Sequence, residues 1–240
     1  MFIHCELLVL ILGLTLDGRV HTGEIIGGHE AVPHSRPYMA LLKMLKDNGK
    51  TGYCCGFLLN QDFVMTAAHC QAKSYTVFLG LHDFHNRNGV QQLNVKQTYP
   101  HKDFHDEKND IMLLKLSSKA NFTKNVKPIA LADKDDVSPK SCLVSGWGRT
   151  ERYDSNSMSV TLKDVTVTLS DNEKYALDNM YCSEGATGPG QGDSGGPLVC
   201  EDGKAYGVVS FYKENDLTYF TKIPDSTSWM EKAMMHETID

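Results

Sequence analysis

The chain has 240 residues, with 24 lysines and arginines against 30 aspartates and glutamates, and a formal net charge of −6 at pH 7. Hydrophobic residues make up 41% and charged residues 22%, which is enough apolar material for a packed core and excludes a disordered chain. The acidic balance argues against nucleic acid as a partner, because a general nucleic-acid binder needs a basic surface that displaces counterions.

The long apolar run of the sequence lies at its N-terminus, over residues 7–16. It is too short to span a bilayer, which takes about 20 residues, so we expect no membrane span. Its position favours a secretory signal peptide over residues 1–22, although residues 1–6 carry no Lys or Arg. A buried N-terminal helix is the alternative.

Cysteine usage agrees with secretion, because six cysteines follow residue 24 and a secreted chain of this size commonly bonds some or all of them in pairs. A metal site is the weaker interpretation, since the sequence has no paired C-x-x-C motif and its histidines are scattered. We therefore expect disulfides and no metal. The six are Cys54, Cys55, Cys70, Cys142, Cys182 and Cys200.

From residue 25 onward, short runs of β-branched and apolar residues alternate with Gly, Asn and Asp, which predicts a β-sandwich or barrel. Clear examples are residues 75–79, 111–116, 165–169 and 206–211. Only the C-terminus has helical spacing, where four apolar residues would share one face. These are Trp229, Met230, Ala233 and Met234.

No Pro- or Ser-rich linker divides the chain, so two lobes would have to be closely joined, and we place the join near residues 120–128. The same stretch contains Asn121-Phe122-Thr123, an N-glycosylation sequon. Asn121 is therefore a candidate glycosylation site in a secreted chain.

Three segments carry candidate catalytic chemistry. Residues 192–197, Gly-Asp-Ser-Gly-Gly-Pro, place Ser194 among glycines that allow a sharp bend, so that two backbone N–H groups can face a developing oxyanion. His69 lies in Met-Thr-Ala-Ala-His-Cys, and Asp110 stands at the mouth of an apolar run. Taken alone, His69 would more often be a structural or surface histidine and Asp110 a turn or capping residue.

Together, in the order His69, Asp110, Ser194, these segments resemble the trypsin/chymotrypsin family of serine proteases. Further matches are Ile-Ile-Gly-Gly at 25–28, Ser-Gly-Trp-Gly at 145–148 and Gly-Val-Val-Ser at 207–210. The resemblance implies an all-β, trypsin-like fold of two antiparallel six-stranded β-barrels with a C-terminal α-helix. Its protease domain would span residues 25–240, with barrels over about 25–122 and 123–225 and the helix over about 226–236.

The resemblance also implies a role for each site residue. Ser194 Oγ would attack the scissile carbonyl, His69 would act as general base, and Asp110 would hold the His69 tautomer. The backbone N–H groups of Gly192 and Ser194 would form the oxyanion hole.

The same resemblance implies a mode of activation and two disulfide bonds. The new ammonium of Ile25 would pair with Asp193 once the preceding residues are removed. The implied disulfides are Cys54–Cys70 and Cys142–Cys200. No cofactor is implied, and Leu81, where calcium-binding relatives have an acid, argues against calcium.

The surroundings of these motifs indicate a branch of the family. Residues 23–24, Gly-Glu, resemble the acidic activation dipeptide of granzymes and related mast-cell proteases, and Gly190 stands where a disulfide beside the primary pocket would need Cys. The implied enzyme is a monomer, secreted or stored in secretory granules, that acts on protein or peptide substrates and is bound by protein protease inhibitors. The alternatives are a catalytically silent protease-like binding protein and a digestive or plasma protease.

Two cysteines depart from the family pattern. Cys55 stands where the family usually has Gly, and Tyr175 stands about where Cys182 would need a partner. We expect both thiols to be free. The segment between Ser170 and Ser194 is also short for the family.

The primary specificity pocket is expected to be narrow and uncharged. Gly188 at its base offers no carboxylate for Arg or Lys, and Thr218 on its wall offers no cation for Asp. Tyr212 follows Ser210-Phe211 where Gly is usual, and a bulky Tyr212 facing Thr218 would close the pocket to all but small residues such as Ala or Val. The alternative is that Tyr212 swings outward and leaves room for Phe, Tyr or Leu.

Overall fold

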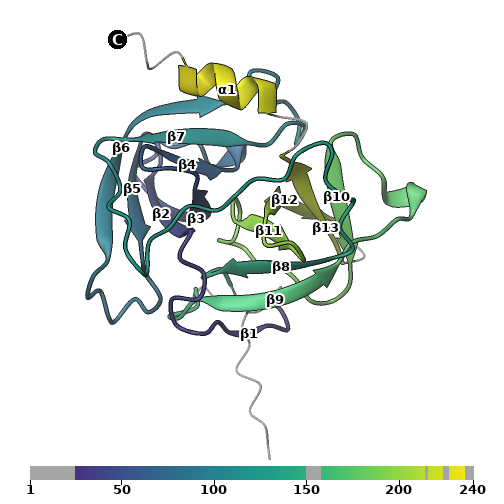
Figure 1. The fold of residues 1–240 in the computed structure, drawn as a ribbon, viewed down its shortest axis with the longest axis horizontal. Coiled ribbons are helices and arrows are strands. Elements are labelled where there is room, and N and C mark those ends of the chain that lie inside the picture. The colour runs from purple at the N-terminus through teal and green to yellow at the C-terminus, as the bar shows by residue number, and fades with distance from the viewer. Residues whose placement is uncertain (1–24, 150–157, 214–215, 224–226, 236–240) are drawn as a thin grey trace, which may run out of the picture.

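A computed structural model describes residues 25–149, 158–213, 216–223 and 227–235. Two lobes built from β-strands lie side by side, with one α-helix packed on the first (Figure 1). The expected signal peptide and activation dipeptide, residues 1–24, lie outside the described residues. Among the described residues, none of the helices combines the length and the hydrophobicity that crossing a membrane requires.

The first lobe is a closed, antiparallel barrel of six strands in the order β2-β3-β4-β7-β6-β5, which confirms the expected architecture. Strands β2, β3, β4 and β7 are buried over several consecutive residues, and the core of this lobe contains aliphatic side chains such as Leu42, Val64 and Leu114. Its strands are β2 (Met39–Leu45), β3 (Thr51–Leu58), β4 (Phe63–Thr66), β5 (Ser74–Leu79), β6 (Gln91–Pro100) and β7 (Met112–Leu116).

The second lobe, expected as a six-stranded barrel, is an antiparallel sheet of seven strands in the order β1-β9-β8-β11-β12-β13-β10, because the two-residue strand β1 adds to β9. The sheet curls back on itself, because Leu169, directly after β9, bridges to Ser183 in β10. Its strands are β1 (His29–Glu30), β8 (Ser141–Gly146), β9 (Lys163–Thr168), β10 (Met180–Glu184), β11 (Pro197–Cys200), β12 (Ala205–Lys213) and β13 (Leu217–Lys222).

Residues 25–30 belong to the second lobe, whereas the first barrel was expected to begin at residue 25. His29 and Glu30 pair with Asp164 and Lys163 of β9, so residues 25–30 cross over before the first barrel begins. The physical reason is the burial of Ile25, which packs in the hydrophobic cluster of the second lobe.

The C-terminal helix α1 (Thr227–Met235) returns to the first barrel and lies across it beside β6 and β7 (Figure 1). Met230 and Ala233 are buried in the core of that barrel, and Trp229 and Met234 are partly buried against it, so the predicted apolar face is confirmed. The ring of Trp229 contacts His101 just after β6, with 5.2 Å between ring centroids. Helix α1 therefore connects the end of the second lobe to the first barrel through hydrophobic contacts.

Both expected disulfides are present, Cys54–Cys70 in the first lobe and Cys142–Cys200 in the second. Cys55 and Cys182 are buried and free, also as expected. Each disulfide restricts the unfolded chain according to the length of the loop it closes.

We expect removal of the second disulfide to cost more stability than removal of the first. The two close sequence separations of 58 and 16 residues, for which chain entropy gives about 4 and about 3 kcal/mol. Guanidinium unfolding of the double variants Cys142→Ala/Cys200→Ala and Cys54→Ala/Cys70→Ala measures both losses in the free energy of unfolding. A larger loss for the Cys54–Cys70 pair would contradict this expectation.

Candidate active site

His69 and Asp110 are brought together by the pairing of β4 with β7. His69 lies on the short 3-10 helix η1 (Ala68–Cys70) after β4, and Asp110 precedes β7. Asp110 Oδ2 lies 2.6 Å from His69 Nδ1, and Asp110 Oδ1 accepts a hydrogen bond of 2.8 Å from the His69 backbone N–H. One carboxylate therefore fixes both the ring and the backbone of the histidine.

Asp110 is held as an anion between the two lobes. Ser210, in β12 of the second lobe, donates a 2.5 Å hydrogen bond to Asp110 Oδ2. Burial by itself raises the pKa of Asp110, but hydrogen bonds from His69 and Ser210 outweigh it and hold that pKa below its ordinary value. An ionised carboxylate can only accept, so Nδ1 of His69 must donate, and the lone pair of a neutral ring is then on Nε2.

Ser194 is presented on a tight loop between β10 and β11. Its carbonyl accepts a 2.8 Å hydrogen bond from the N–H of Cys55 in β3, and the N–H of Gly195 donates to Val209 in β12 at 2.8 Å. Gly195 has φ +83°, and a Cβ there would collide with Thr66 Oγ1. The loop is thus tied to both lobes, and only glycine fits behind the serine.

The N–H groups of Gly192 and Ser194 are the candidate oxyanion donors. Within the described parts of the chain, neither donates a hydrogen bond to another protein group. Both are therefore available to a ligand beside Ser194 Oγ.

Two cavities meet at Ser194. One, of about 380 Å³, is lined by His69, Asp110 and Ser194 together with the expected pocket residues Ser210, Tyr212 and Thr218. The other, of about 720 Å³, shares His69, Gln191 and Ser194 with the first and adds Gly192. The structure thus gathers residues from positions 69 to 218 around one cleft.

The structure places Gly188 away from the expected pocket base and Tyr212 partly outward, as the alternative considered for Tyr212 allowed. Gly188 does not line the first cavity; it lies behind Thr218, whose Oγ1 would be 3.5 Å from a Cβ at Gly188. Tyr212 pairs with Thr218 across β12 and β13, and the residue is 58% exposed. The tyrosine therefore forms a wall of the cavity without being buried in it.

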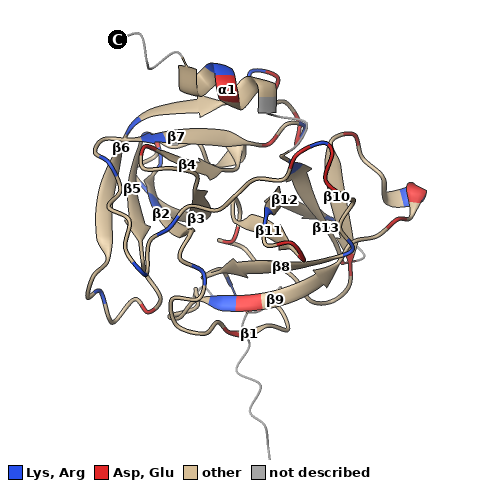
Figure 2. Ribbon diagram, in the orientation of Figure 1, with Lys and Arg blue, Asp and Glu red and all other residues tan. Residues whose placement is uncertain are grey.

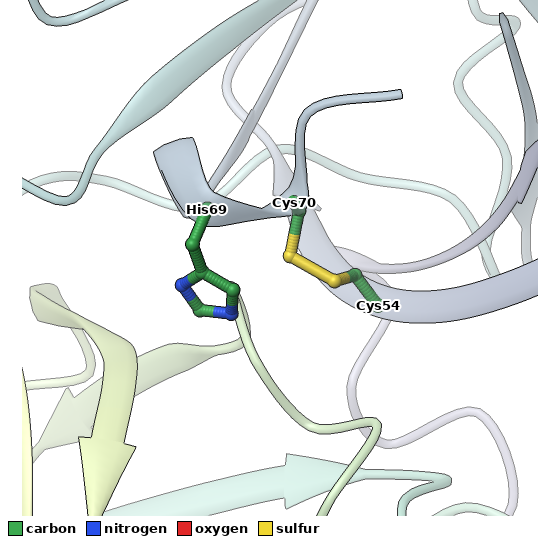
Figure 3. Close-up of side chains that lie close together, drawn as sticks. All are labelled: Cys54, His69 and Cys70. Carbon is green, nitrogen blue, oxygen red and sulfur yellow. A yellow bond between two sulfur atoms is a disulfide. The ribbon is translucent and has the colours of Figure 1, made fainter. Parts of the chain in front are cut away.

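His69 also lies beside the Cys54–Cys70 disulfide (Figure 3). These three are the one group of three potential metal ligands found among the described residues. Because the two sulfurs are bonded to each other, neither is a thiolate that could hold a metal. One ring nitrogen of His69 lies within 4.8 Å of each of the two sulfurs.

Asp193, next to Ser194, is a completely buried carboxylate. It accepts hydrogen bonds from the N–H groups of Gly148 at 2.6 Å and Gly190 at 2.8 Å. Burial raises the pKa of Asp193 to about 6, although these two hydrogen bonds lower it. A Cβ at Gly148 would collide with this carboxylate, which explains the glycine there.

Cys55 lies beside Asp193, a neighbour that the sequence did not reveal. Its Sγ is 4.0 Å from Asp193 Oδ1, and the side chain is fully buried. Burial, with a smaller contribution from the Asp193 charge, raises the pKa of Cys55 well above its ordinary value, so this cysteine remains a thiol.

Four further residues line the first cavity, although no sequence motif indicated them. They are Phe104, Glu107, Gln191 and Phe211.

Comparison with known proteins decides the family. A model of the Trypsin family matches residues 25–230. The chain belongs to the trypsin family. It is 41% identical to Granzyme B(G,H) of Mus musculus, covering 95% of this chain and 98% of the relative, and 41% identical to Mast cell protease 3 of Ovis aries, covering 95% and 96%. The solved structure described as "Structure of GrC" superposes with a TM-score of 0.79 at 37% identity, covering 88% of this chain and all of that one.

These similarities confirm the resemblance. The chain is a trypsin-like serine endopeptidase related to granzymes.

We expect Asp193 to make the unprocessed protease less stable at neutral pH than in mild acid. The ordinary pKa of Asp193 is 3.8, and in the folded chain it is raised to about 6. Between these two pH values the folded chain keeps a proton on Asp193 that the unfolded chain has lost. The free energy of unfolding therefore falls by up to about 3 kcal/mol as pH rises through that window.

Denaturant unfolding of the unprocessed chain and its Asp193→Asn variant at pH 4, 5, 6 and 7.5 isolates this contribution. The stability of the variant relative to the parent should increase by about 2–3 kcal/mol over the series. A difference that does not change with pH would show that Asp193 ionises freely in the folded chain.

Proposed function

We propose that this protease is a granzyme-like endopeptidase that hydrolyses protein substrates through an acyl-enzyme formed on Ser194. The observation that carries the proposal is the pair of hydrogen bonds that Asp110 accepts from His69, because it leaves Nε2 of His69 to take a proton. His69 removes the Ser194 proton during attack and returns it to the leaving amine; water then repeats the sequence on the acyl group. The N–H groups of Gly192 and Ser194 stabilise the oxyanion in both steps.

Activation depends on the burial of both Asp193 and Ile25. Removal of residues 1–24 would release the Ile25 amine, and Ile25 is itself completely buried in the second lobe. An ammonium there would compensate the Asp193 carboxylate, which is otherwise costly to keep ionised. Because Asp193 lies between Gly192 and Ser194, this ion pair would fix the two N–H groups of the oxyanion hole.

The names of the relatives support secretion or storage in secretory granules. The 1–22 segment would act as the signal peptide, and exposed Asn121 would be available for glycosylation. We expect a monomer that protein protease inhibitors block at the same cleft.

The first cavity supports a preference for small or apolar residues immediately before the cut. Among its described lining residues, the charged side chains are Glu107, exposed at the rim, and Asp110, which is bound to His69. No cation is therefore present among them to receive an acidic residue. Tyr212 and Thr218 restrict the width available to larger side chains.

Three forms of the chain test the reaction. The form that begins at Ile25 should cleave peptides and react with a fluorophosphonate probe at Ser194. The Ser194→Ala form should keep its fold by circular dichroism and lose essentially all activity, and the form that retains Gly23-Glu24 should be nearly inactive because its Ile25 amine is blocked. A folded, processed chain that neither cleaves nor reacts would indicate a silent binding protein instead.

Peptides that differ only in the residue before the cut test the pocket. We expect the processed enzyme to prefer Ala and Val over Phe, and to cleave poorly after Asp, which would meet no cation in the cavity. Cleavage after Arg or Lys should also be poor, because Glu107 is exposed at the rim and Asp110 is already bound to His69, so neither is a buried counter-charge. Tyr212→Gly should raise kcat/KM for the Phe peptide by about tenfold or more, with the Ala peptide as internal reference. Fast cleavage after Phe by the parent would show that Tyr212 leaves the pocket open.

A further inference from the structure

Cys55 contacts the loop that carries Ser194 at several consecutive positions. Its backbone N–H donates a 2.8 Å hydrogen bond to the Ser194 carbonyl. Its own carbonyl oxygen would be only 2.5 Å from a Cβ on Gly195, and its Cβ would be 3.5 Å from a Cβ on Gly196. One residue of β3 in the first lobe therefore packs closely against residues 194–196 of the second.

The side chain of Cys55 extends these contacts to Asp193. Its thiol donates to Asp193 Oδ1, with 4.0 Å between sulfur and oxygen, and both residues are completely buried. The Trp147 backbone donates a hydrogen bond to the same sulfur, which leaves the thiol proton for the carboxylate. Because burial keeps the pKa of Cys55 well above its ordinary value, that proton is present throughout the neutral range.

Asp193 has few other partners. Lys, Arg, Asp and Glu are spread over both lobes (Figure 2), but among the described residues no cation forms an ion pair with Asp193. Its hydrogen bonds in that part of the chain come from the N–H groups of Gly148 and Gly190 and from the Cys55 thiol. A thiol is a weak donor, yet beside a carboxylate in a buried site of low dielectric its bond is stronger than it would be in water.

We propose that Cys55 is a positioning residue for the oxyanion hole. The thiol holds Asp193, and Asp193 in turn fixes the N–H groups of its two neighbours, Gly192 and Ser194. This role rests on the proposed function. Cys55 lines neither of the two cavities beside Ser194, so it acts through Asp193 and does not touch the substrate.

The pH dependence of stability tests the bond to Asp193 without reference to activity. Cys55→Ala is compared with its parent by denaturant unfolding of the unprocessed chain at pH 4 and pH 7.5. A donor to a carboxylate stabilises the ionised form, so its loss should raise the pH at which Asp193 titrates in the folded chain by about half a unit to one unit. The loss of stability should therefore be larger at pH 7.5, where Asp193 is ionised, than at pH 4, where it is protonated.

Two controls isolate that bond. In an Asp193→Asn background, Cys55→Ala should cost the same stability at both pH values. Cys182→Ala removes the other buried free thiol, whose hydrogen-bond partners are Ser183 and Tyr219, and its cost should also be independent of pH.

Equal losses at pH 4 and pH 7.5 for Cys55→Ala in the parent would make Cys55 a packing residue only and would overturn the proposal. If Cys55→Ala does not fold, Cys55→Ser and Cys55→Val allow the same comparison. Only serine keeps a donor, so the loss that grows with pH is then expected for Val and not for Ser.

Kinetics of the processed enzyme test the positioning role itself. Cys55→Ala should lower kcat about three- to tenfold and leave KM nearly unchanged, because oxyanion donors act mainly in the transition state. Cys55→Ser should recover most of that loss, and Cys182→Ala should keep the parental kcat. An unchanged kcat in Cys55→Ala would overturn the positioning role alone. A processed parent that neither cleaves nor reacts with a fluorophosphonate probe would overturn the proposed function and this role with it.

Discussion

The burial of the Asp193 carboxylate is the constraint on which the rest of the cleft depends. Its two oxygens accept hydrogen bonds from Gly148 and Gly190, so one side chain organises two loops of the second lobe. The flanking residues Gly192 and Ser194 supply the candidate oxyanion donors, and they cannot keep their positions if Asp193 leaves its own. A carboxylate whose pKa is raised to about 6 by burial is poorly compensated by backbone dipoles alone. The ammonium expected at Ile25 would supply the missing charge.

The cleft is also a junction between the lobes, and its chemistry uses both. His69 and Asp110 come from the first barrel, whereas Ser194 and Ser210 come from the second lobe. The Ser210 hydroxyl of the second lobe donates to Asp110 of the first, and the Cys55 N–H of the first lobe donates to the Ser194 carbonyl of the second. The docking of α1 on the first barrel adds a third connection. Because the proposed reaction needs close alignment, a small shift of one lobe would separate the base from the nucleophile.

The sequence predicted the elements whose residues carry a local signal. The β-branched run at 165–169 lies largely in β9, and Trp229 and Met230, whose apolar spacing predicted a helix, lie in α1. The residues around Ser194 were recognisable because glycine is required at φ +83° beside it. The pairing of β1 with β9 was missed, since a strand of two residues has no periodicity and its partner is far away in the chain. The contact of Cys55 with Asp193 was missed for the same reason, because 138 residues separate them.

The distribution of charge in the cleft explains where selectivity can arise. A pocket without a buried counter-charge discriminates by size, and a methylene group is worth only about 1–3 kcal/mol there. Many proteins offer a small apolar residue in an accessible loop, so such a pocket admits many sites.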